Sequence, residues 1–460
     1  MKQNTNKKRA FAGGFLRTAA TVATALALVS TSRATAQEKL WTMDDCIRYA
    51  VANSPAVRRQ AIANETARVE STAATAAFFP SIAVGVQGQY NFGRAIDPET
   101  NTYVNTTTFN NYYEVGASLP VFDGGELINK WQLAKQNRQK GMNDLQKAKD
   151  DLALKTMEAF VNVVYYRGTS RFAEEKLSES NRILYKARRE EELGLKGLAD
   201  IAQIEAQAAA DDYNLTAQQN LYTTSMLKLK ELLNFPTDVE LPVDTAAFDI
   251  DYLHDAASAT DIFAAAQATN PTAISSAYDV KTADMQKRIE RSRLFPTITL
   301  QGGVYTSYYE NLKSESAPMA FNSQFKNNRG EYIALVFRYP LFDRLSQWTS
   351  YRRARNNARI AQEQHTETLR QLETAIAQAV ADRDGYAKES VQMEKKLAAD
   401  EMAYRVTLRK FEEGLMSPLD LRTASNALIE SQANLLQRQL MYLLKRRLVD
   451  YYRGGELVDE

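Results

Sequence analysis

The segment FFPSIAVGVQGQY at residues 78–90 returns as LFPTITLQGGVYT at residues 294–306. Both copies pass from a proline into alternating apolar and polar side chains, which is the period of a β-strand. Farther along the chain, SLPVFDGG at 118–125 matches RYPLFDRL at 338–345, and the Gly-Leu pair at 194–195 returns at 414–415. Markers that recur in one order at a spacing of about 220 residues indicate an internal duplication.

Each copy predicts the same order of elements: helix, strand, polar loop, strand, very long helix, short turn and helix. We expect a first repeat over residues 37–235, a linker over 236–260, a second repeat over 261–453 and a tail over 454–460. The strands are expected at about 81–92, 110–120, 297–308 and 331–340, and the long helical hairpins at about 127–233 and 345–452.

The predicted strands carry apolar side chains on one face and polar side chains on the other. In the first strand Ile82, Val84 and Phe92 fall on one face, and Gln87 and Gln89 on the opposite face. Strands of about ten residues cross a bilayer at a tilt, and this alternation is typical of a water-filled barrel in an outer membrane. A soluble sheet packed on helices would also alternate, but the polar second face and long polar loops favour the membrane.

Four strands cannot close a barrel, and an open sheet edge is not viable in lipid. The chain is therefore expected to self-associate. Two copies would supply eight strands and almost no lumen, whereas three would supply twelve strands and an open one. Strand number favours a trimer without requiring it.

The two long helices predict an extended conduit. A helix of about 69 residues reaches roughly 100 Å and needs coiled-coil support along its length. Each long helix ends at a glycine suited to a left-handed cap. These turns must lie far from the membrane, where a gate and partner docking are expected; the docking candidates are Gly194, Leu195, Gly414 and Leu415. A coiled-coil tether without a pore is the other reading of the helices alone.

The start of the chain predicts export. A basic N-terminus precedes the apolar stretch at 18–30, and small residues follow at 34–36. This pattern is typical of a secretory signal peptide over residues 1–36. After Gln37 the sequence contains no run of 18 apolar residues, so it predicts no transmembrane helix there.

Composition argues against several classes of function. The chain has 57 basic and 56 acidic residues, for a net charge of +1, so nothing indicates a nucleic-acid partner. The single cysteine, Cys46, is expected to be a buried helix residue, and His365 is expected to face water. With so few soft ligands we expect no metal site, and without catalytic or nucleotide motifs we expect no enzyme and no cofactor.

Several motifs together resemble the TolC-type outer-membrane efflux family: LWTMDDCIRYAVANSP (40–55), PVFDGG (120–125), PLFD (340–343), MEAFVNVVYY (157–166) and the paired GL-x(4)-D turns. The resemblance covers nearly the whole chain after the leader. It implies a mainly α fold in which three copies close a twelve-stranded β-barrel in the outer membrane, surrounded by lipid. It also implies a continuous α-helical barrel in the periplasm, a periplasmic adaptor of the membrane fusion class and an inner-membrane pump.

The resemblance also implies a periplasmic gate. Asp420 matches the family position of an acidic ring, where crowding would give cation preference and a raised pKa for some carboxyls. Thr423 stands at the position of a second acidic ring, and Met416 at that of a gate-locking arginine, so the lock differs here. Phe411 and Asp200 match other gate-linked positions. Alternatively, Asp420 simply favours the helix N-terminus after Ser417.

We therefore predict a passive exit channel of a tripartite efflux or secretion system. One alternative within the class is a type I duct for polypeptides. A different class is a periplasmic coiled-coil scaffold, against which the repeated strands of membrane length argue.

Overall fold

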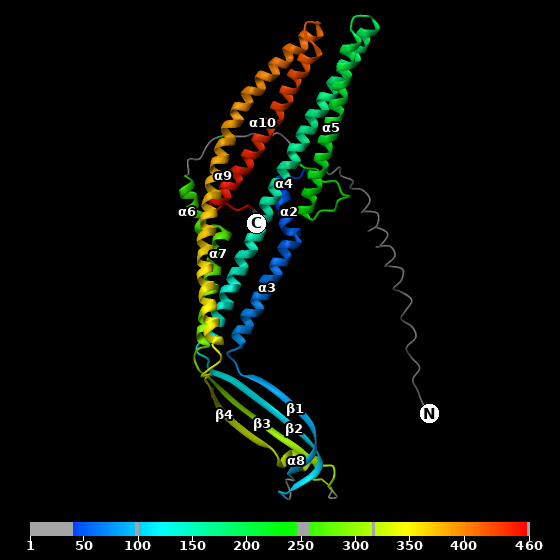
Figure 1. Cartoon of the computed structure of the whole chain (residues 1–460). Coiled ribbons are helices and arrows are strands. Elements are labelled where there is room, and N and C mark those ends of the chain that lie inside the picture. Colours follow the sequence, from blue (N-terminus) through cyan, green and yellow to red (C-terminus); the bar gives the residue numbers. More distant parts are fainter. Residues whose placement is uncertain (1–39, 97–100, 246–251, 253–257, 315–317, 458–460) are drawn as a thin grey trace, which may run out of the picture.

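The computed structural model describes residues 40–96, 101–245, 252, 258–314 and 318–457. The expected signal peptide lies outside this part of the chain. The described residues form an elongated molecule with a four-stranded sheet at one end and two long helical hairpins reaching away from it (Figure 1). The mainly helical architecture confirms the predicted fold class for the single chain.

The elements fall into two series of similar order, and the second series has one additional short helix, α8, between its strands. The first series comprises α2 (Met43–Asn53), α3 (Pro55–Ala76), β1 (Ser81–Ile96), β2 (Tyr103–Phe122), α4 (Glu126–Glu192) and α5 (Leu198–Leu233). The second series comprises α6 (Ala259–Thr269), α7 (Pro271–Ser292), β3 (Thr297–Asn311), α8 (Phe321–Asn327), β4 (Gly330–Arg338), α9 (Ser346–Glu412) and α10 (Pro418–Tyr452).

The two opening helices are broken at corresponding places by a cap followed by proline. Ser54 Oγ accepts a hydrogen bond from Ala56 N (3.2 Å), and Asn270 Oδ1 accepts one from Thr272 N (2.9 Å). Proline suits the first helical position because its missing N–H would have no partner there. The break therefore follows directly from the local sequence.

The aspartate of each repeated Phe-Asp motif starts a long helix. Asp123 Oδ2 accepts a hydrogen bond from Leu127 N (2.7 Å), and Asp343 Oδ2 accepts one from Gln347 N (2.8 Å). Carboxylates satisfy the free N–H groups of a helix N-terminus and oppose its positive end. Both motifs therefore turn a strand into a helix.

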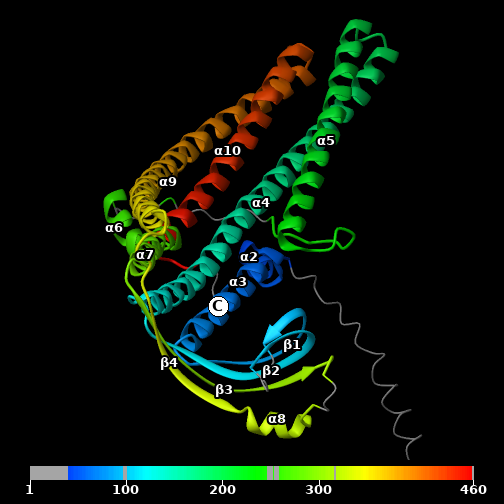
Figure 2. The ribbon, with the colours of Figure 1, turned by 60° about the horizontal axis from the view of Figure 1, so that its bottom comes forward.

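The strands pair in chain order, β1-β2-β3-β4, and all neighbours are antiparallel. Val84 lies opposite Val115, and Val115 lies opposite Val304, so apolar side chains align across the sheet. Much of that face is uncovered in the single chain, where 74% of Val84 and 86% of Ile333 are exposed. At one end α8 covers it, because Phe321 and Phe325 pack against Tyr113. Figure 2 shows the sheet as a curved layer beyond the helices.

Two of the expected loops differ from the structure. β1 and β2 reach beyond the strand ends predicted at about 92 and 110, and pairs such as Arg94 with Asn105 lie between those ends. Apolar and polar side chains do not alternate over residues 93–96 and 103–109, so the period of two did not predict these extensions. In the second loop, α8 is an unpredicted helix, and the Gln324 side chain bonds both the N–H and the carbonyl of Tyr309, each at 2.9 Å.

Helices from both repeats share the core. α3 and α5 both contact α4, while α7 and α10 both contact α9, and α7 also contacts α4. Cys46 is completely buried with Val163 and Leu229, as expected, and burial raises the pKa of its thiol to about 12. A thiol so buried is unreactive at neutral pH.

His365 corrects an expectation from the sequence. It was expected to face water from the middle of a long helix, but it is half-buried, and its Nδ1 lies 2.8 Å from Ser276 Oγ on α7. A single sequence does not reveal that α7 covers this side of α9.

Candidate functional site at the hairpin tips

The tips of both hairpins lie at the end of the molecule farthest from the sheet (Figure 1). Gly194 and Gly414 have φ angles of 71° and 75°, the left-handed region that favours glycine. Leu195 N donates to Glu190 O (2.8 Å) and Leu415 N to Lys410 O (2.8 Å), closing the same C-terminal cap in both turns. These four candidate docking residues therefore form two matched turns, with Leu195 and Leu415 largely exposed.

Asp420 forms a capping box with Ser417 at the start of α10. Its carboxylate accepts hydrogen bonds from Ser417 Oγ (2.7 Å) and Ser417 N (3.1 Å), while Asp420 N donates to Ser417 Oγ (3.2 Å). These bonds hold the pKa of Asp420 below its ordinary value. In the single chain Asp420 thus serves the helix N-terminus, and a ring of carboxylates needs other copies of the chain.

The other gate candidates occupy different environments. Thr423 is exposed one turn after Asp420, and its hydroxyl donates to Leu419 O (2.9 Å) within its own helix. Asp200 is half-buried in the first turn of α5. Phe411 is buried between the hairpins, and Met416 packs against the same cluster. Of the five gate candidates, Phe411 and Met416 therefore share one apolar cluster, of which Asp200, Asp420 and Thr423 are not members.

Phe411 belongs to a cluster that joins the two hairpins. It packs with Ile201 and Ile204 of α5 and with Leu421 of α10. The Lys196 ammonium lies 4.7 Å from the centre of the Phe411 ring and 3.1 Å from a Glu190 carboxylate oxygen. A cation over an aromatic face adds an electrostatic attraction to this apolar contact.

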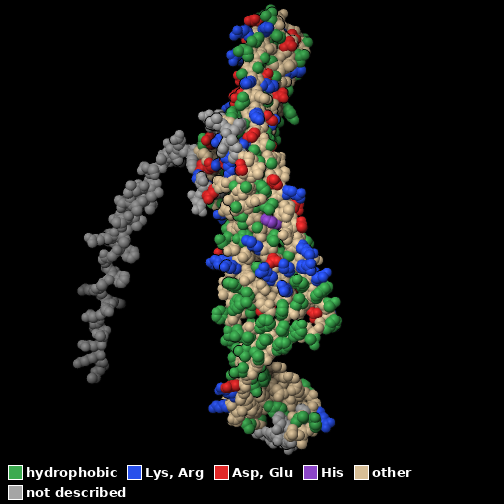
Figure 3. Space-filling model, turned by 90° about the vertical axis from the view of Figure 1, so that its left-hand side faces the viewer, with side chains coloured by type: hydrophobic (Ala, Val, Ile, Leu, Met, Phe, Trp, Pro, Cys, Tyr) green, Lys and Arg blue, Asp and Glu red, His purple; other side chains and the backbone are tan. Residues whose placement is uncertain are grey.

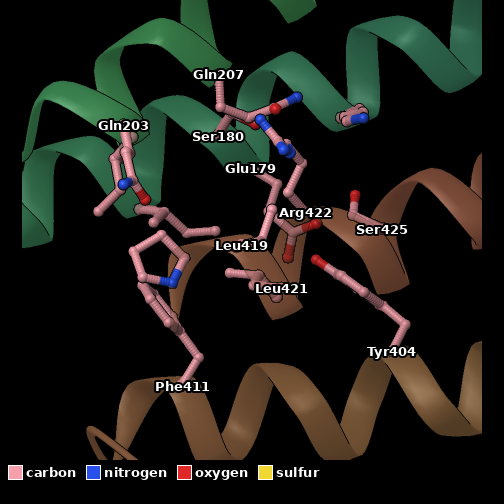
Figure 4. A pocket seen from close by; sticks show the side chains of 14 residues that line it. Glu179, Ser180, Gln203, Gln207, Tyr404, Phe411, Leu419, Leu421, Arg422 and Ser425 are labelled. Carbon is pink, nitrogen blue, oxygen red and sulfur yellow. The ribbon is translucent and has the colours of Figure 1, made fainter. Parts of the chain in front are cut away.

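A cavity of roughly 370 Å³ lies beside this cluster, between the hairpins (Figure 4). Tyr404 and Phe411 line it from α9, Glu179 and Ser180 from α4, and Arg422 from α10. Burial raises the pKa of the Tyr404 phenol, and the neighbouring Glu179 carboxylate raises it further. The heptad spacing of Tyr404 and Phe411 places them on one side of α9.

A polar network next to the cavity escaped sequence reasoning. Lys176 Nζ lies 3.2 Å from Asp211 Oδ1, and the two side chains are only 10% and 5% exposed. Ser180 Oγ (2.6 Å) and Gln207 Nε2 (2.9 Å) also donate to the Asp211 carboxylate. Lys176 further donates to Asn426 Oδ1 of α10 (2.5 Å), which links the two hairpins.

Two chemical features are absent from the described part of the chain. No group of three or more histidine, cysteine, aspartate or glutamate side chains is arranged to hold a metal ion among those residues. Nor does any helix among them have the length and apolar character needed to cross a membrane.

Comparison with known proteins identifies the class of molecule. The family model described as "Outer membrane efflux protein" matches residues 46–234 and 263–447. No curated protein sequence matches the chain significantly. The chain is similar in fold to VceC of Vibrio cholerae, with 15% identity over 90% of this chain and 96% of that one and a TM-score of 0.77.

Two further solved structures share the fold. The Campylobacter jejuni CmeC outer membrane channel has 15% identity over 91% of this chain and 87% of its own, with a TM-score of 0.77. The open state of the Neisseria gonorrhoeae MtrE outer membrane channel has 18% identity over 90% and 89%, with a TM-score of 0.73.

Proposed function

The chain belongs to the outer membrane efflux protein family, and we propose that three copies form a passive exit duct fed by an inner-membrane pump. As a member of this family, it is an outer-membrane protein with a periplasmic helical domain. The proposal assigns the chain no catalytic step; the pump supplies the energy. In this proposal the exported chain begins after residue 36. A linker over 236–260 joins the repeats 37–235 and 261–453, and a tail over 454–460 follows.

The exposed apolar face of the sheet carries this proposal. β1 and β4 each pair on one side only within the described chain, and the aligned apolar side chains of Val84, Val115 and Val304 remain uncovered. Lipid can cover such a face, but it cannot satisfy the backbone groups of an open edge. Joining β4 of one copy to β1 of the next satisfies both requirements, and three copies give twelve strands.

The hairpin tips support the second part of the proposal. Leu195 and Leu415 lie in glycine-capped turns and are 75% and 72% exposed. Exposed apolar side chains at the end of a helical hairpin suit a helical partner that covers them. We assign these tips to docking of a periplasmic adaptor, and Asp420 to the constriction formed where three copies meet.

The cargo is the open part of the proposal. A duct for polypeptides and a duct for small molecules need the same wall. The alternative of type I secretion is therefore distinguished by which cargo is no longer exported when the chain is deleted. A periplasmic scaffold without a pore is a different class, and it would leave the apolar sheet face in water.

Mass and conductance of the detergent-purified chain test the proposal together. We expect a trimer that inserts into planar bilayers of phosphatidylcholine and gives discrete, cation-selective current steps. A soluble monomer or dimer would exclude the channel and favour the scaffold. If folded trimers give no current, the Lys176 variants described below distinguish a closed channel from a protein without a pore. We expect these variants to conduct.

A further inference from the structure

The two long helices repeat one surface pattern next to the sheet. On α4, Ile128, Trp131, Lys135 and Arg138 follow one another at spacings of three, four and three residues; on α9, Leu345, Trp348, Arg352 and Arg355 do the same. Such spacing places each set along one side of its helix. All eight side chains are exposed. We call Lys135, Arg138, Arg352 and Arg355 the basic stripe.

The basic stripe lies in two sequence segments that contain no acidic residues. Residues 127–143 contain four basic and no acidic side chains, and residues 344–362 contain five basic and none acidic. The stripe residues form no ion pair with a carboxylate in the part of the chain that the structure covers. The helix dipole does not explain them, because it favours acidic residues near an N-terminus.

Aromatic rings accompany the cations in both copies. The Arg352 guanidinium lies 4.9 Å from the centre of the Trp348 ring, and the Lys135 ammonium lies 5.9 Å from that of Trp131. Figure 3 shows apolar side chains gathered where the sheet meets the helices, with Lys and Arg side chains directly next to them on the helices. An apolar zone bordered by tryptophan and then by basic residues matches the order of acyl chain, interface and headgroup in a leaflet.

The dimensions of the stripe also fit a lipid headgroup layer. Arg352 and Arg355 stand about 6 and 10 Å beyond Trp348 along the helix axis, at 1.5 Å per residue. The headgroup region of one leaflet is about 5 to 8 Å thick, and long basic side chains reach back toward it along the helix. Arg359 is about 17 Å away and lies beyond this reach.

We propose that the basic stripe binds the phosphate groups of anionic phospholipids in the periplasmic leaflet of the outer membrane, so that both helices are fixed at the membrane surface. This inference rests on the proposed function, which puts the sheet in that membrane and the helices below it. A soluble polyanion would satisfy the charges, but it would leave Trp131, Trp348 and Leu345 in water.

Native mass spectrometry of the full chain, purified as a trimer in detergent, tests the inference with phosphatidylglycerol against phosphatidylcholine. We expect the trimer to retain phosphatidylglycerol preferentially. The preference should fall about fivefold for each cation removed in Arg352→Gln/Arg355→Gln and in Lys135→Gln/Arg138→Gln. Arg352→Lys/Arg355→Lys should keep it, because the charge remains.

The matched control is Arg370→Gln/Arg405→Gln, which removes two exposed arginines of the same helix far from the sheet. We expect this pair to keep the preference. Equal retention of both lipids by the unaltered chain, equal loss in the control pair, or full displacement of lipid by inorganic phosphate would each overturn the inference. A trimer that conducts in phosphatidylcholine but shows no lipid preference would refute this inference alone, whereas a soluble monomer would refute the channel.

Discussion

Lys176 of α4 and Asn426 of α10 share a hydrogen bond of 2.5 Å, although 250 positions separate them in the chain. The same ammonium is paired with the buried Asp211 carboxylate of α5. One cation therefore holds both hairpins together near their tips, beside the cavity and the Phe411 cluster. Within the proposed channel, these contacts resist separation of the two hairpins and so favour a duct that is narrow at its periplasmic end.

Lys176→Met should open the duct and destabilise the hairpins. Loss of one partner leaves the Asp211 carboxylate buried without a cation, which costs about 3 kcal/mol or more. The double variant Lys176→Met/Asp211→Leu removes that buried charge, so it should regain thermal stability of the trimer yet keep the raised conductance. Lys186→Met changes an exposed lysine of the same helix and should alter neither quantity. Unchanged conductance in both Lys176 variants would show that the hairpins are not held here.

Asp420 has two roles that one pair of variants separates. Asp420→Asn should weaken block of the pore by cobalt(III) hexammine by on the order of tenfold, since each close contact of unlike unit charges contributes about 1 kcal/mol even in water. Ser417→Ala removes the cap but keeps the carboxylate, so the block should remain while the helix start loses about 1 kcal/mol. Because the Ser417 hydrogen bonds lower the pKa of Asp420, the carboxylate is charged at pH 7. Equal block in Asp420→Asn and the unaltered chain would refute the constriction ring.

The turn glycines should respond differently from a glycine within a helix. An added Cβ at Gly194, Gly414 or Gly385 meets nothing within 4 Å, so packing does not distinguish them. Alanine at Gly194 or Gly414 must adopt a positive φ, which costs about 1 to 2 kcal/mol. Gly385→Ala in the middle of α9 should instead stabilise by roughly 0.5 to 1 kcal/mol. The temperature at which the trimer dissociates measures both the expected loss and the expected gain of stability. A lower dissociation temperature for all three alanine variants would contradict the conformational argument.

Local sequence patterns predicted the duplication, the long helices and the glycine turns, because each depends on residues close together in the chain. Cys46 was likewise expected to be buried in its helix. The network around Lys176 was not predictable in the same way. Its members look like ordinary surface charges until α4, α5 and α10 are brought together. The prediction that His365 faces water was wrong for the same reason, since its partner Ser276 belongs to another helix. A gate formed by Asp420 and Thr423 requires contacts between several copies of the chain, and the structure of one copy does not contain such contacts.

The two faces of the sheet should tolerate charge unequally. Leu335 on β4 is 67% exposed and lies opposite Leu300, within the apolar face. Gln301 is the neighbour of Leu300 on the opposite face, and it pairs with Ala334. If lipid covers the apolar face, Leu335→Arg costs about 2 to 4 kcal/mol near the bilayer midplane, whereas Gln301→Arg points into water and costs little. The yield of heat-resistant trimers in outer-membrane extracts should therefore fall for Leu335→Arg only. The reverse pattern would mean that the polar face is turned outward, and it would remove the physical basis for a water-filled duct.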